Sequence, residues 1–185
     1  MHQTYPLSSN RFLVLELCEA TVDDYIRRRY IADSMPSDCE ALFQMASGVQ
    51  YIHSKGFVHR NIKPENVLIS ASGLKIADFG FCKPFRPSGS FSMSSSGPRG
   101  TRIYSAPEFL QLEGKSKDEK EKIRCDISID VFSLGCMFFC YIKKGDHPFA
   151  KPGSPITYAV ASNIIHGKKY LDRGEHHFIF YNKFK

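Results

Sequence analysis

The sequence predicts an α+β fold that is mostly helical, opens with a strand and carries short β-hairpins. Residues 12–17 form a short, mostly apolar run that is typical of a buried strand. Residues 67–69 and 74–76 are two more extended segments, and the Ser and Gly residues between them favour a tight turn. Residues 131–142 are apolar on all sides, as in a helix buried in a core. A chain of 185 residues is long enough to form one such core.

Two helix starts precede the first hairpin. Thr21 and Asp24 have the spacing of a capping box, and Ser37 with Glu40 repeats that spacing. Apolar residues then recur at helical intervals until Gly56, which predicts a helix that buries one stripe. The stripe consists of Leu42, Met45, Val49 and Ile52.

The second half of the chain holds two expected surface segments and one more helix. Residues 84–100 are rich in Ser, Gly and Pro with few apolar anchors, so we expect a mobile loop. Residues 114–124 have mixed charge and are expected at the surface. Residues 156–166, closed by Gly167, could form a helix.

The composition argues against several classes of protein. Six cysteines without a Cys-x-x-Cys pair indicate a reducing compartment and no zinc site. The longest apolar run is too short to cross a bilayer, so we expect the chain by itself to be soluble. A net charge of +6 and the cluster Arg27, Arg28 and Arg29 would suit nucleic acid or acidic lipid, although a solvated helix end explains the cluster as well.

Three short motifs carry the chemistry. Residues 58–66 read Val-His-Arg-Asn-Ile-Lys-Pro-Glu-Asn, and Asp-Phe-Gly at 78–80 and Ala-Pro-Glu at 106–108 follow them. Each motif alone could be a chance turn, but their order and spacing leave little room for chance. Together they resemble the catalytic loop, the magnesium motif and the end of the activation segment of eukaryotic protein kinases.

The resemblance implies the C-lobe of a protein-kinase-like fold, with the hinge strand present and with most of the N-lobe and the last C-lobe helices absent. Residues 1–20 would be a remnant of the N-lobe strands and hinge, and residues 173–185 a truncated tail. Residues 21–172 would form the C-lobe, with its catalytic loop at 58–66 and its activation segment at 78–108.

Four further segments, residues 16–21, 81–83, 130–136 and 145–149, are similar to the inositol-requiring enzyme family of endoplasmic-reticulum stress sensors, which combine kinase and ribonuclease. This implies a serine/threonine kinase of the unfolded protein response with ATP and Mg²⁺ as cofactors. Its partner would be a protein substrate or a second copy in trans, as a homodimer. It would lie on the cytosolic side of the membrane, attached only through absent domains, and this segment would not contact nucleic acid directly.

The same resemblance assigns roles in phosphoryl transfer. Asp78 would hold magnesium against the phosphates, and Asn66 would offer its amide oxygen to a second ion. Lys63 would lie near the transferred phosphate, and Thr101 would brace the catalytic loop. Lys63 at this position is typical of serine/threonine kinases. Asp130 would accept backbone hydrogen bonds from the catalytic loop.

The resemblance also implies residues for adenine and for a regulatory phosphate. Leu15 would be the gatekeeper behind the adenine pocket, or ordinary strand core, and the backbones of Glu16 and Cys18 would bind adenine. Arg60 would capture a phosphate on the activation segment, where a flexible polar loop is the alternative. The candidate phosphorylation sites are Ser90, Ser92, Ser94, Ser95 and Ser96.

Two departures from the kinase pattern affect the expected activity. Asn61 stands where active kinases have an aspartate that takes the proton of the acceptor hydroxyl, and a general base contributes ~10²- to 10⁴-fold. The first lysine is Lys55 and no glycine-rich loop precedes the hinge, so the phosphate-anchoring lysine is missing. We also expect Glu108 to lack the arginine that it would normally pair with, and hence to shift its ionisation, draw in water or find another cation.

Three functions remain open at this stage. The first is a partial serine/threonine kinase domain of the stress-sensor type. The second is a catalytically impaired pseudokinase module that binds nucleotide or a partner, which Asn61 and the missing lysine favour. The third, a basic nucleic-acid binder, rests on net charge and the arginine cluster alone.

Overall fold

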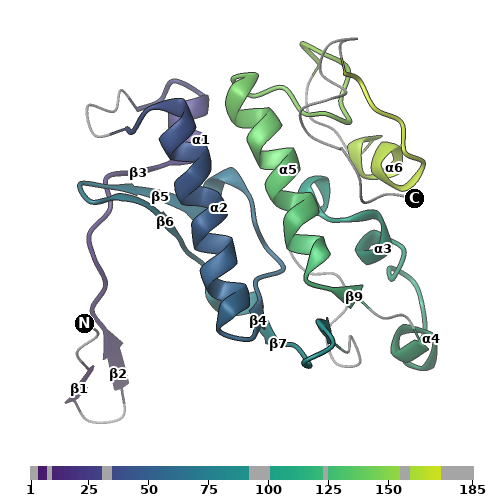
Figure 1. Cartoon of the computed structure of the whole chain (residues 1–185), viewed down its shortest axis with the longest axis horizontal. Coiled ribbons are helices and arrows are strands. Elements are labelled where there is room, and N and C mark those ends of the chain that lie inside the picture. The colour runs from purple at the N-terminus through teal and green to yellow at the C-terminus, as the bar shows by residue number, and fades with distance from the viewer. Residues whose placement is uncertain are drawn as a thin grey trace.

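Two antiparallel long helices form the centre of the molecule, and short strands and turns surround them. A computed structural model describes residues 4–7, 10–30, 35–91, 101–122, 125–154 and 159–171. Helix α2 (Asp38–Ser54) and helix α5 (Ser128–Ile142) lie side by side (Figure 1). The predicted α+β class is confirmed.

A small antiparallel sheet lies against α2. It has the order β3 (Ala20–Thr21), β5 (Val67–Ser70) and β6 (Gly73–Ile76), and β5 and β6 form the predicted hairpin. Gly73 ends the turn at a φ of 112°, and a Cβ there would lie 2.7 Å from Gln44 Oε1 on α2, so this close approach requires glycine. Among the residues that the structure describes there are also three two-stranded pairs: β1 (Thr4–Leu7) with β2 (Asn10–Leu13), β4 (Phe57–Val58) with β7 (Lys83–Pro84), and β8 (Ser90–Phe91) with β9 (Cys125–Asp126).

The remaining helices are short. They are α1 (Val22–Ile26), α3 (Pro107–Leu110), α4 (Lys117–Lys122) and α6 (Ala159–Ile165), and 3₁₀ turns occupy Pro64–Asn66, Phe79–Phe81 and Arg102–Tyr104. The capping box of Thr21 and Asp24 is confirmed. The one predicted at Ser37 and Glu40 is only half formed, because the Glu40 carboxylate accepts a hydrogen bond from Gln44 instead of turning back to the cap.

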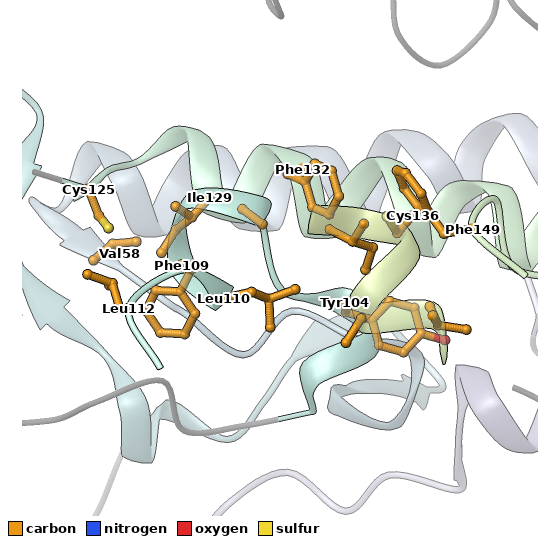
Figure 2. Packing of buried hydrophobic residues seen from close by; sticks show 14 of the residues in the cluster. Val58, Tyr104, Phe109, Leu110, Leu112, Cys125, Ile129, Phe132, Cys136 and Phe149 are labelled. Carbon is orange, nitrogen blue, oxygen red and sulfur yellow. The ribbon is translucent and has the colours of Figure 1, made fainter. Parts of the chain in front are cut away.

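Helix α5 joins two halves of the core. Figure 2 shows Ile129, Phe132 and Cys136 along one side of this helix, and the ring of Phe149 lies 5.8 Å from that of Phe132. Residues on its other side pack with α1, α2 and β5. The expectation that this helix is buried on all sides is confirmed for most of its length, but Val131 in its first turns is 56% exposed.

The expected buried strand at residues 12–17 is wrong in its second half. Strand β2 ends at Leu13, and residues 14–19 have no regular structure. Leu15 is 63% exposed and Leu17 is 92% exposed. An apolar run indicates burial only if another segment packs on it, and none of the described segments covers these side chains.

The segment predicted as a mobile loop at residues 84–100 begins with ordered structure. Ser90 and Phe91 form β8, whose register pairs Phe91 with Cys125 in β9, and Phe91 is only 4% exposed. One aromatic anchor was therefore missed among the Ser and Gly residues. Residues 92–100 lie outside the described part of the chain.

Within the described residues, no helix has the length and apolar character needed to cross a membrane.

Candidate functional site

A buried carboxylate organises the loop at residues 58–66. Asp130, at the start of α5, is fully buried, and its Oδ2 accepts hydrogen bonds from His59 N at 2.7 Å and from His53 Nε2 at 2.8 Å. Its Oδ1 accepts from Arg60 N at 2.8 Å. Arg60 has a φ of 67°, a left-handed conformation that costs free energy unless the surroundings hold it. The predicted role of Asp130 as an acceptor for the catalytic loop is confirmed.

The imidazole of His59 connects this loop to the segment that carries Asp78. Its Nε2 donates to the carbonyl of Ala77 at 3.0 Å, because a carbonyl can only accept, and its Nδ1 accepts from Asn61 N at 3.3 Å. These bonds require the neutral ring, in agreement with the burial that lowers the pKa of His59. The Phe79 ring lies edge-on to it at 5.3 Å.

Three predicted site residues meet beside this imidazole. Asn61 Nδ2 donates to Asp78 Oδ2 at 2.8 Å. Asn66 Nδ2 donates to the backbone carbonyl of Asn61 at 2.8 Å and lies 3.4 Å from Asp78 Oδ2. A backbone carbonyl and a carboxylate can only accept, so both amides must present their nitrogen atoms here. Both amide oxygens are then left as acceptors.

These groups suit magnesium. Asp78 is exposed to solvent, and the side-chain oxygen of Asn66 takes part in no hydrogen bond with a described residue. Magnesium prefers such oxygen ligands and usually keeps several waters or substrate oxygens instead of filling an all-protein cage. No cluster of three or more His, Cys, Asp or Glu side chains that could hold a metal occurs in the part of the chain that the structure describes. The donor set therefore fits an ion that is shared with a phosphate.

Lys63 and Thr101 come together across the site. Lys63 has an extended backbone before the 3₁₀ turn at Pro64–Asn66, and its Nζ donates to Thr101 Oγ1 at 2.8 Å. This bond joins Thr101 to a residue of the loop at 58–66. It therefore ties the loop to the segment before α3.

The predicted adenine contacts lie on the extended stretch before β3. Its end is fixed by the bond from Glu19 N to Ile69 O at 2.8 Å. The Glu16 carboxylate accepts from Ser72 Oγ at 2.9 Å, and hydrogen bonds from serines of the β5–β6 turn lower its pKa. The N–H of Cys18 and the C=O of Glu16 form no backbone–backbone hydrogen bond with described residues, and the Glu16 carbonyl accepts one from Cys18 Sγ at 3.7 Å. Burial raises the pKa of the Cys18 thiol.

An apolar groove of about 490 Å³ borders the site on the side of α2. Phe43 and Tyr51 of α2 line it together with Ile76 and Phe79, and Phe79 is 55% exposed. Leu15, proposed as the gatekeeper, is not among its lining residues. The structure thus brings together the residues that were predicted for magnesium and for the catalytic loop, whereas Leu15 is exposed and lies outside this groove.

The residues of the activation segment are only partly described. Arg60 Nε donates to the carbonyl of Phe81 at 2.5 Å, which places the arginine against the turn that follows Asp78. Ser90 lies in β8, whereas Ser92, Ser94, Ser95 and Ser96 lie outside the described residues. Burial raises the pKa of Glu108, which has no ion pair among the described residues.

Sequence reasoning missed His53 and the two connections of the His59 ring. His53 lies near the end of α2 and reaches Asp130 across 77 positions of sequence. A polar residue on the otherwise apolar stripe of a helix was the available signal, because a buried polar side chain needs a partner.

The loop on Asp130, the segment at Asp78 and the arrangement of α2 and α5 define a protein kinase lobe. A family model described as the protein kinase domain matches residues 1–176, and the chain belongs to this family.

Several of the curated relatives are named as serine/threonine-protein kinase/endoribonucleases, and others as ribosomal protein S6 kinases. The chain is 32% identical over 176 residues to the serine/threonine-protein kinase/endoribonuclease ire-1 of Caenorhabditis elegans, covering 90% of this chain and 16% of that protein. It is 36% identical over 146 residues to the human serine/threonine-protein kinase/endoribonuclease IRE2, covering 75% of this chain and 15% of that protein. It is 29% identical over 183 residues to the sensor for unfolded proteins in the ER ire1 of Schizosaccharomyces pombe, covering 86% of this chain and 16% of that protein.

The resemblance to the inositol-requiring enzyme family is confirmed by these matches. The chain spans about a sixth of the length of these relatives.

Proposed function

We propose that the chain is the C-lobe of a serine/threonine protein kinase that binds ATP and Mg²⁺ but transfers phosphate poorly. The carrying observation is the meeting of Asn61, Asn66 and Asp78, with Asn61 Nδ2 at 2.8 Å from Asp78 Oδ2. Asn66 and Asp78 offer the oxygen atoms that the metal needs. Transfer also needs an acceptor for the proton of the substrate hydroxyl, and a carboxamide is not basic enough to take it.

The remaining roles follow the family pattern. Lys63 would neutralise charge on the moving phosphate, with Thr101 holding it in place, and bound magnesium would neutralise the phosphate oxygens. Leu15 and the backbones of Glu16 and Cys18 would meet adenine. Arg60 and the phosphorylated serines would order the activation segment. Residues 1–20 would form the remnant of the N-lobe strands and the hinge, residues 21–172 the C-lobe and residues 173–185 its tail.

A second candidate is a pseudokinase module without transfer, which signals through nucleotide or partner binding. The observation that favours it is the direction of the Asn61 amide, whose hydrogen points at Asp78. Both candidates fit a stress-sensing protein on the cytosolic face of the endoplasmic reticulum, because one similar protein is named a sensor for unfolded proteins in the ER. The partner in trans would then be a protein substrate or a second copy of the chain.

Nucleotide binding is tested by titrating ATP with magnesium into the full-length protein and following its melting temperature. A ligand that binds only the folded state must raise the apparent stability, by about 2.7 kcal/mol at a hundredfold excess over its dissociation constant. We expect a shift that Asp78→Asn weakens and that the exposed Asp118→Asn on α4 leaves unchanged. The absence of any shift in the wild-type protein would refute the proposed ATP site.

A further inference from the structure

The carboxylate of Asp78 is compensated by amides instead of by a cation. It forms no ion pair with any described residue, and Oδ2 has the amide nitrogens of Asn61 at 2.8 Å and Asn66 at 3.4 Å as partners. Hydrogen bonds to a charged acceptor are about twice as strong as neutral ones. The shorter bond comes from Asn61, whose side chain is buried and therefore held in place.

The residue at position 61 determines whether a cation or a proton is required to compensate the negative charge of Asp78. An aspartate there would bring a second carboxylate to about the distance of the present hydrogen bond, and two like charges so close require a cation or a proton between them. Asn61 removes that requirement because its Nδ2 is itself a donor. The amide thus supplies, without metal, part of the compensation that a divalent ion would supply.

The bond also opposes metal binding. A cation that approaches Asp78 Oδ2 meets the Asn61 amide hydrogens, which carry partial positive charge, and must displace them. Asn66 differs in this respect, because its main hydrogen bond goes to the carbonyl of Asn61 and its own oxygen stays available. The two asparagines therefore act in opposite directions on the same ion.

We propose that Asn61 competes with magnesium for Asp78, so that nucleotide affinity at this site depends far less on magnesium than it would with aspartate or an apolar residue at position 61. The proposal rests on the proposed ATP site and adds a determinant of its metal dependence. Asn61 thereby has a function of its own beyond the loss of a base.

The test compares ADP affinity in magnesium chloride and in EDTA, by calorimetry on the full-length protein at one pH. Asn61→Leu removes the donor while keeping the branching at Cγ and adds no charge, and Asn61→Asp removes the donor and adds charge. Gln111→Glu adds the same charge at an exposed position after α3. We expect the ratio of the two affinities to rise about tenfold in Asn61→Leu, more in Asn61→Asp, and not in Gln111→Glu. An equal ratio in wild type and Asn61→Leu overturns the proposal.

A second measurement needs no nucleotide and separates this proposal from the ATP site. In EDTA, Asn61→Asp should melt below the wild-type protein, and magnesium should restore most of the loss while leaving the wild type unchanged. If no variant binds ADP but this rescue occurs, the proposed ATP site fails and the competition at Asp78 stands. If Asn61→Asp melts like the wild type in EDTA, or if magnesium raises both proteins equally, the competition is refuted.

Discussion

Removing the carboxylate of Asp130 should destabilise the lobe more than any change at its surface. Asp130→Ala leaves three donors without their acceptor: His59 N, Arg60 N and His53 Nε2, now at 2.7 to 2.8 Å. A buried donor left unsatisfied costs about 1–3 kcal/mol, and these three share one site, so their costs do not simply add. Because the donors lose one shared acceptor together, we expect a loss of about 3 kcal/mol, at the upper end of this range.

The assay is urea unfolding of the 185-residue chain, read as a change in midpoint at constant slope. Asp130→Asn keeps the shape and one acceptor oxygen but turns an amide group towards a donor, so its loss should be intermediate. Asp118→Ala, on the exposed face of α4, serves as the control and should stay within about 0.5 kcal/mol of wild type. A loss below about 1 kcal/mol for Asp130→Ala would refute the assignment of this carboxylate as the organiser of the loop.

Three further changes test electrostatic interactions in the lobe. Burial raises the pKa of Glu108, so its charged form opposes folding. Glu108→Gln should therefore raise the urea midpoint at pH 7 but not at pH 4. Equal gains in the midpoint at both pH values would count against this. Burial lowers the pKa of His147 from 6.5 to about 4, so the unfolded chain binds more protons and stability falls as pH drops through this window. Between pH 6.5 and pH 4, the free energy of unfolding of His147→Phe, measured with urea, should fall by about 3 kcal/mol less than that of the wild type. Parallel plots of this free energy against pH for the two proteins would contradict the assignment. The ammonium of Lys144 lies 5.2 Å from the Tyr25 ring and 4.9 Å from the Tyr141 ring. Lys144→Met should therefore lower the free energy of unfolding by about 0.5–1 kcal/mol, and Lys144→Arg by less. Equal losses in the two variants would argue against a cation–π contact.

Local patterns in the sequence predicted the elements that depend on neighbours in the chain. The β5–β6 hairpin follows from two apolar runs around a Ser and Gly turn, and the α1 capping box follows from the spacing of Thr21 and Asp24. The buried helix α5 follows from its apolar composition. These features need little information beyond a short window.

Features that depend on distant packing were predicted less well. The run at residues 12–17 was expected to be buried, yet Leu15 and Leu17 are exposed, because composition does not say which segment will cover an apolar face. Phe91 was missed for the converse reason, since its partner strand β9 lies more than thirty residues further on. Where burial depends on a remote segment, apolar composition therefore overestimated burial in one case and underestimated it in the other.

The candidate site could be predicted only in part from sequence motifs, because some of its contacts depend on the folded structure. Sequence motifs identified Asn61, Asn66 and Asp78 individually and the substitution at Asn61 as a lost base. The hydrogen bond from Asn61 to Asp78 depends on side-chain orientation, and His53 reaches Asp130 only in the folded chain. The spacing of residues in the sequence does not encode this side-chain orientation. The orientation is the basis for the proposal that Asn61 not only lacks the catalytic base but also competes with magnesium for Asp78.

The most direct test of the central claim is autophosphorylation of the full-length protein with labelled ATP, before and after Asn61→Asp. If Asn61 limits phosphoryl transfer while the remaining site is intact, the aspartate variant should be faster by ~10²-fold or more. Robust activity that is equal in both proteins would contradict the claim.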